Sequence, residues 1–105
     1  MLNFCSLYSG SSGNSLFVET ENTKLLIDAG VSSKKIENAL DGLNINPSLL
    51  DGILITHEHS DHVQGLGTFA KKFNVPVFVN SKTLDNMPKQ KDKIPQNIIK
   101  NFAIG

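Results

Sequence analysis

The chain has 105 residues with a formal net charge of zero, and all of its basic residues are lysines. This length allows one small domain that buries about two-thirds of its unfolded surface, and no apolar run reaches the roughly eighteen residues of a membrane span. The N-terminus lacks a basic segment followed by a long apolar stretch, so we expect a cytoplasmic protein without a signal peptide. Cys5 is the single cysteine, so it cannot form an internal disulfide, and we expect a small core residue.

The first part of the chain predicts a run of strands followed by a helix. The predicted strands cover residues 2–8, 15–20 and 23–28. Glu21-Asn22 is expected to form a tight turn between the last two. Residues 32–43 predict a helix capped by Ser32. Its predicted inner face consists of Ile36, Ala39, Leu40 and Leu43.

The later part of the chain alternates strands with helices. Strands are predicted over residues 52–56 and 75–79, with an amphipathic helix over 63–73 between them. A short helix is expected from Ser81, as its cap, to Asn86, with Pro88 as its stop. Early strands followed by mixed β/α units predict an α/β fold, a mixed sheet with flanking helices.

Lysines follow this short helix at positions 89, 91 and 93. They could approach phosphate groups, but a solvated loop is the favoured interpretation of so short a charge run. The absence of arginine argues against sequence-specific reading of DNA by this chain, because guanidinium groups are the side chains most used to read guanine. Contact with a nucleic-acid backbone remains open.

The segment Thr56 to His62 reads Thr-His-Glu-His-Ser-Asp-His and contains all three histidines of the chain. Imidazole nitrogen and carboxylate oxygen are ligands that zinc accepts readily, with manganese and iron as competitors. Alternate residues of an extended segment point the same way, so His57 and His59 are expected to converge on one ion. Asp61 and His62 follow where the chain turns and would face a second ion. The pattern predicts a two-metal platform just after a buried strand.

The alternative interpretation of this segment is a polar or histidine-rich surface loop that binds no metal. Histidine is uncommon, so these four positions would be filled by chance in fewer than about one in ten thousand chains of this length. The metal site is therefore the favoured hypothesis.

Asp28 and Thr56 are candidate supports for the metal ligands. A histidine that binds metal usually donates its other ring N–H to a carboxylate or carbonyl, and Asp28 follows a predicted strand where it could accept such a bond. The alternative is a turn aspartate before Ala29-Gly30. Thr56 is expected to support the loop through its hydroxyl.

The segment from Ser9 to Ser15 is rich in serine and glycine and has two interpretations. Its glycines could let backbone amides approach a phosphate, and Ser11, Ser12 and Asn14 could donate hydrogen bonds to a substrate or position the metal loop. Alternatively, the glycines only form the turn between the first two strands. The residues alone do not separate the two.

Taken together, these motifs resemble the first half of a metallo-β-lactamase fold hydrolase. The resemblance rests on His-x-His-x-Asp-His after an apolar strand and on Asp28 at the end of an earlier strand. The serine-glycine segment and Gln64-Gly65-Leu66 narrow it to the YycJ/WalJ branch, and it covers most of residues 2–80. The resemblance implies half of an αββα sandwich and a cytoplasmic metal-dependent phosphodiesterase, proposed to act as a DNA exonuclease. It also favours the substrate-lining interpretation of the serine-glycine segment.

Members of the family take a third histidine, a bridging aspartate and a last histidine from later in the chain, and this sequence stops before them. We therefore interpret residues 1–105 as one incomplete domain, an N-terminal fragment with no linker or second domain. Such a fragment should expose an apolar sheet face, which favours self-association. With two protein ligands per ion, we expect weak or partial metal occupancy and negligible turnover by this chain alone.

For the complete protein, the resemblance implies two divalent ions, zinc foremost, that activate water as hydroxide for attack on a DNA phosphodiester. His57 and His59 would hold one ion, and Asp61 and His62 the other, with Asp61 also orienting the nucleophile. One alternative is hydrolysis of a small thioester, lactone or other ester on the same platform. Another is a catalytically inactive module.

Overall fold

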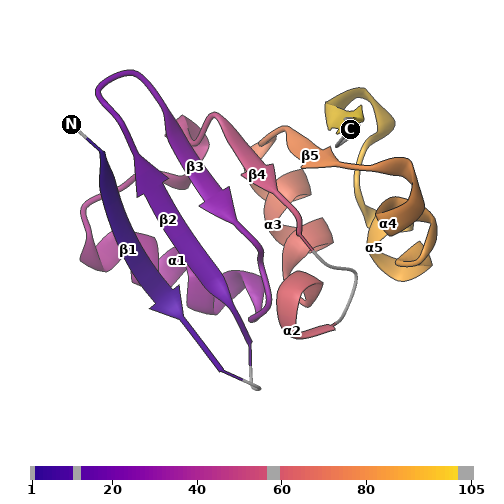
Figure 1. The fold of residues 1–105 in the computed structure, drawn as a ribbon, viewed down its shortest axis with the longest axis horizontal. Coiled ribbons are helices and arrows are strands. Elements are labelled where there is room, and N and C mark those ends of the chain that lie inside the picture. The colour runs from indigo at the N-terminus through magenta and orange to yellow at the C-terminus, as the bar shows by residue number, and fades with distance from the viewer. Residues whose placement is uncertain (1, 11–12, 57–59, 102–105) are drawn as a thin grey trace.

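The computed structural model describes residues 2–10, 13–56 and 60–101, without the side chains of Ser60 and Asp61. The strands form a single mixed sheet in chain order (Figure 1). They are β1 Asn3–Tyr8, β2 Ser15–Glu19, β3 Lys24–Ile27, β4 Gly52–Leu54, β5 Val77–Val79 and β6 Ile99–Asn101. Neighbours from β1 to β3 are antiparallel, and those from β3 to β6 are parallel. The expected α/β class is confirmed.

All of the described helices lie in the connections between the parallel strands. They are α1 Ser33–Gly42, α2 Ser60–Val63, α3 Leu66–Phe73, α4 Ser81–Asp85 and α5 Pro88–Lys93, with 3-10 turns η1 Pro47–Leu49 and η2 Gln96–Ile98. Helices α1 and α3 lie on the same face of the sheet (Figure 1). No helix within the described residues has the length and apolar character needed to cross a bilayer.

The core lies between the sheet and α1 and α3. Alternate strand residues point to this side, and Leu26, Ile53 and Val77 are fully buried there. Ile36 of α1 and Phe69 of α3 are fully buried as well. Burying each such side chain contributes about 1.5–3 kcal/mol, so this layer holds the strand ends in fixed positions.

The opposite face of the sheet is also apolar. Strand register places Val18 beside Phe4 and Leu25, and Leu54 beside Ile27. Phe4 is 64% exposed, and the others are half-buried. Among the described residues no helix covers this face (Figure 1). The structure thus shows an apolar sheet face of the expected kind, while self-association remains a prediction.

Two predicted helices differ from those observed. The helix predicted over residues 63–73 is divided into α2 and α3, with a turn at Gln64-Gly65. A Cβ on Gly65 would lie 2.1 Å from the Val31 carbonyl oxygen, so the turn at Gly65 approaches the backbone of residues 31–33 too closely for any side chain. Leu43 is 39% exposed and was wrongly placed on an inner face, because α1 ends at Gly42.

The segment after β5 also differs from prediction. Asn80, not Ser81, caps α4, because its side chain accepts the Thr83 N–H. Pro88 does stop α4 but also begins α5, at a position where its missing N–H has no cost. The lysines at 89, 91 and 93 therefore lie on a helix and not on the predicted loop.

Candidate metal centre

The carboxyl ends of β3 and β4 lie side by side and bring Asp28 next to Thr56. These strands are parallel, with Ile27 paired to Leu54, and the Asp28 N–H continues the ladder by donating to the Leu54 carbonyl at 2.9 Å. Residues that follow neighbouring parallel strands emerge at the same sheet edge. The start of the histidine motif is thereby fixed against the end of β3.

The Asp28 carboxylate accepts three hydrogen bonds at this edge. Its Oδ1 accepts the Thr56 N–H at 2.8 Å, and its Oδ2 accepts the Thr56 hydroxyl at 2.6 Å. The same Oδ2 lies 2.8 Å from Nδ1 of His62. Asp28 is only 6% exposed. A buried carboxylate is stable only when it is bonded in this way, so Asp28 joins both ends of the motif segment.

The contact with Asp28 defines which nitrogen of His62 can bind a metal. Beside a carboxylate oxygen, Nδ1 carries the proton and donates it, so Nε2 presents the lone pair. The backbone of His62 is also held, because its carbonyl accepts the Ala29 N–H at 2.7 Å. The ring and the first turn of α2 are thus oriented by residues 28 and 29 together.

Asp28 adopts a left-handed backbone conformation with φ of 64°. Non-glycine residues rarely do so, although aspartate and asparagine tolerate it best. Such strain persists only where the surrounding structure imposes it, and it is concentrated at functional sites. Here it accompanies the turn that aims the carboxylate across the sheet edge towards Thr56 and His62.

Further hydrogen bonds hold the backbone of residues 28–30, and their individual partners were not predicted from the sequence. The buried Ser15 hydroxyl donates to the Asp28 carbonyl at 2.9 Å. The Gly30 N–H donates to the Asn14 carbonyl, and the Gly65 N–H to the Ala29 carbonyl, both at 2.8 Å. Only the serine-glycine composition before Ser15 hinted at this support, since hydroxyls and glycines favour tight turns.

The serine-glycine segment is closed by the side chain of Asn14. Its amide donates to the Gly10 carbonyl at 3.1 Å, and its oxygen accepts the Gly10 N–H at 3.2 Å. Gly13 has φ of 147°, and a Cβ there would lie 2.5 Å from a methyl of Val31. These contacts give Asn14 a part in the turn. Ser11 and Ser12 lie outside the described residues.

The predicted metal ligands are described only in part. His57 and His59 lie outside the described residues, and Asp61 is described only as backbone in α2. Among the side chains that the structure does describe, no group of three or more His, Cys, Asp or Glu is placed to hold a metal ion. The ligand assignments to His57, His59, Asp61 and His62 remain predictions.

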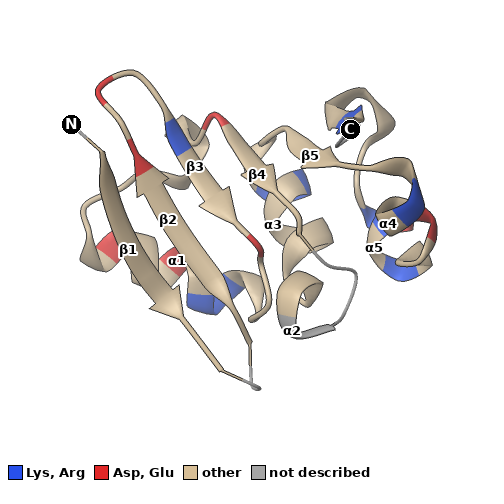
Figure 2. Cartoon of the chain, viewed as in Figure 1, with Lys and Arg blue, Asp and Glu red and all other residues tan. Residues whose placement is uncertain are grey.

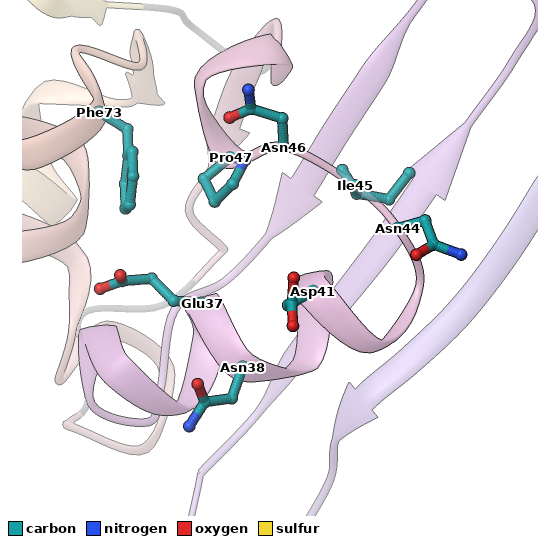
Figure 3. Close-up of a pocket in the computed structure, with 8 residues that line it drawn as sticks. All are labelled: Glu37, Asn38, Asp41, Asn44, Ile45, Asn46, Pro47 and Phe73. Atoms are coloured by element: carbon teal, nitrogen blue, oxygen red, sulfur yellow. The ribbon is translucent and has the colours of Figure 1, made fainter.

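A hollow of about 550 Å³ lies between α1, the segment after it and α3 (Figure 3). Its lining residues are Glu37, Asn38, Asp41, Asn44, Ile45, Asn46, Pro47 and Phe73. Pro47 precedes β4 and Phe73 precedes β5, so the hollow opens at the amino ends of the parallel strands. It is therefore separate from the edge that carries Asp28 and His62.

The comparison with known sequences gives a family and two informative relatives. The metallo-beta-lactamase superfamily profile matches residues 8–101. An exodeoxyribonuclease YycJ from Bacillus anthracis is 44% identical over 104 residues, which cover 99% of this chain and 39% of that protein. An exodeoxyribonuclease WalJ from Streptococcus pneumoniae is 52% identical over 85 residues, 81% of this chain and 32% of that protein. The chain thus spans well under half of these relatives.

Solved structures give the same fold. A B3 metallo-beta-lactamase with an active-site glutamic acid superposes with a TM-score of 0.78, covering 98% of this chain and 44% of that one. The identity is 18%, so this likeness shows the fold alone. The mixed sheet and its helices therefore correspond to somewhat less than half of that larger structure.

Proposed function

Because the chain belongs to the metallo-beta-lactamase superfamily, we propose that it carries the first part of a dinuclear metal centre in a hydrolase that cleaves DNA phosphodiesters. The observation that best supports this proposal is the Asp28 carboxylate, which holds His62 and Thr56 together at the motif. The relatives named as exodeoxyribonucleases favour DNA as the substrate and cleavage from strand ends as the reaction.

The donor set fits a pair of divalent cations. We propose that His57 and His59 hold one ion and that Asp61 and His62 hold the other, with zinc foremost and manganese or iron as alternatives. The described member of this set, His62, has its Nδ1 against Asp28, which is the arrangement that metal-binding histidines usually have. The chemistry of the residues and the geometry of His62 support the same site.

When bound, the ions supply Lewis acidity, which lowers the pKa of water towards neutrality and offsets negative charge at a scissile phosphate. The residues of the chain position this chemistry. Asp28 keeps the proton on Nδ1 of His62 and so directs Nε2 outward as the ligand atom. Thr56 ties the beginning of the motif to the same carboxylate. We propose that Asp61 also orients the attacking water.

The chain alone is expected to have little activity. Four ligands shared between two ions leave each ion below the three protein ligands of a catalytic zinc site. We therefore propose weak or partial metal binding by residues 1–105 and turnover only when the remaining ligands are supplied.

A nuclease assay with end-labelled DNA and added Zn²⁺ or Mn²⁺ tests the proposal. If the coding sequence continues past Gly105, the assay compares residues 1–105 with the longer protein that the continued sequence encodes. We expect stepwise shortening of DNA by the longer product, loss of that activity in the His57→Ala/His59→Ala variant, and none from residues 1–105. Ester hydrolysis without DNA cleavage would replace the nuclease proposal, and inactivity towards both substrates would contradict it.

A further inference from the structure

Opposite charges are concentrated in the two parts of the chain, although its net charge is zero. Residues 1–65 contain three lysines and eight acidic residues, whereas residues 66–105 contain seven lysines and two aspartates. In Figure 2 the lysine-coloured segments gather over α3, α4 and α5. The basic part thus begins immediately after the metal motif.

Three of these lysines line one cleft between α3 and α5. The cleft has a volume of about 480 Å³ and is lined by Gly67, Thr68, Lys71, Lys72 and Lys93. We call it the lysine cleft. None of the described residues that line it is acidic, and Thr68 adds a hydroxyl that can donate a hydrogen bond. A hollow of this composition suits an anion.

Close packing of α5 on the first turn of α3 forms the floor of the lysine cleft. The Gly67 N–H donates to Oε1 of Gln90 at 2.7 Å, and the Gln90 amide donates to the Gln64 carbonyl at 3.3 Å. A Cβ on Gly67 would lie 2.5 Å from Cβ of Lys93, so glycine is what allows this approach. The lysines are therefore held on two elements that are fixed to each other.

Two of the three lysines have no counter-charge in the described part of the chain. Lys72 donates to Glu37 at 2.9 Å, but neither Lys71 nor Lys93 forms an ion pair with a described residue, and both are exposed. Lysines in the last turns of helices are favoured by the helix dipole, which accounts for their positions along α3 and α5. The dipole does not account for their convergence on one cleft.

The lysine cleft begins at the first turn of α3, which follows the metal motif in the chain. Gly67 lies five residues after His62, and Gly65 between them is bonded to Ala29, the neighbour of Asp28. At 1.5 Å rise per residue, Lys71 lies only about 6 Å further along α3 than Gly67. A DNA strand with one phosphate at the metal centre would have to run along α3 to reach this cleft.

We propose that the lysine cleft binds the phosphate backbone of the DNA strand beyond the scissile phosphodiester, through Lys71 and Lys93. This inference rests on the proposed DNA substrate and adds a second, metal-independent contact for it. The contact reads charge and spacing but no base, because ammonium groups on phosphates carry no sequence information.

The test is fluorescence anisotropy of a labelled single-stranded oligonucleotide with residues 1–105, in the presence of a chelator so that no metal contributes. We expect Lys71→Glu/Lys93→Glu to weaken binding about tenfold or more. The slope of log affinity against log salt should become shallower by roughly one to two, since each lost phosphate contact removes about 0.7. Lys71→Arg/Lys93→Arg should retain binding.

Lys34→Glu/Lys35→Glu is the matched control, because it makes the same charge change on exposed lysines of α1. It should bind DNA like the unaltered chain. The inference would be overturned if both charge reversals weakened DNA binding equally, or if neither weakened it. It would also be overturned if the unaltered chain did not bind DNA. Inorganic phosphate that competes as strongly as oligonucleotide phosphate would assign the cleft to small anions instead. These results depend on DNA binding and not on DNA cleavage. A failure of the nuclease proposal would appear in the cleavage assay instead.

Discussion

Asp28 is the residue on which the candidate metal centre depends. It combines a left-handed backbone, near-complete burial and a carboxylate shared between Thr56 and His62. The left-handed backbone and the burial of a charge each cost free energy, and the hydrogen bonds to Thr56 and His62 offset that cost. A turn aspartate would explain the backbone conformation but not the bond to His62 thirty-four residues away.

Replacing Asp28 by asparagine should destabilise the metal-free chain by about 1.5–3 kcal/mol, the range for hydrogen bonds to a charged group. Asparagine tolerates the positive φ and retains one acceptor, so the loss reports on the carboxylate. Asp28→Gly relieves the backbone but removes every acceptor, and it should be no more stable than Asp28→Asn. Urea denaturation measures both. An asparagine variant as stable as the unaltered chain would show that the carboxylate contributes nothing to the fold.

The junction between α2 and α3 is bonded to the sheet edge and so holds the helical end of the motif in place. Gly65 lies between these helices, donates to the Ala29 carbonyl and packs on the backbone of residues 31–33. Its role is steric, because its φ is not in the left-handed region.

Gly65→Ala should therefore destabilise the chain by about 1–3 kcal/mol, the usual cost of forcing extra volume into a packed site. The physical reason is that the new methyl meets a backbone carbonyl, which cannot rotate away as a side chain can. Gly42→Ala is the control, since a Cβ at Gly42 meets nothing within 4 Å. It should leave the urea midpoint unchanged or raise it. Equal midpoints for all three proteins would contradict the steric argument.

The contact between α1 and α3 includes an ion pair that gives stability a pH dependence. The hydrogen bond from Lys72 lowers the pKa of the Glu37 carboxyl below its ordinary value, with smaller contributions from Ser33 and Lys34. A lowered pKa means that the stabilisation is present above the ordinary pKa and is lost as pH falls through the lowered one. Glu37→Gln should cost no more than about 0.2–1 kcal/mol at neutral pH and nothing in strong acid. Urea denaturation of both proteins from neutral pH to strong acid measures this difference in stability, which should vanish as the pH falls.

The sequence predicts elements better than it predicts the contacts between them. Ser32 caps α1 as expected, because capping depends only on residues a few positions away. The break at Gly65 was not predicted, since apolar residues at 63, 66, 69, 70 and 73 fit one helix as well as two. Asp28 was predicted as an acceptor for a ring N–H of a motif histidine, and the structure shows this contact with His62. Which histidine it would contact could not be predicted, because that depends on how α2 packs at the sheet edge. The metal motif was visible because its residues are consecutive, whereas its support joins three separate segments.

At the scale of the whole molecule, one face of the sheet lacks a covering layer within the described residues. Phe4, Val18, Leu25, Ile27 and Leu54 form an apolar surface on it. Exposed apolar patches of this kind mark sites of association. The relatives are more than twice as long, so their further residues would have a surface to cover.

We therefore expect residues 1–105 to self-associate through this face, with an apparent mass above 11.4 kDa that rises with concentration. Phe4→Lys should shift the chain towards the monomer, because it places a charge at the most exposed apolar position of the face. Leu49→Lys alters a residue that is similarly exposed, at 62%, but lies on η1 outside the sheet. It should have no effect. Sedimentation velocity measures all three, and a monomeric unaltered chain would refute the expectation.

The most direct test of the metal centre is the zinc content of the chain after equilibrium dialysis against a series of free Zn²⁺ concentrations. We predict weak, saturable binding that falls tenfold or more in His57→Ala/His59→Ala and in His62→Ala, and by about 10–100-fold in Asp28→Asn. Zinc uptake that is unchanged in these variants, or absent from the unaltered chain, would contradict the account.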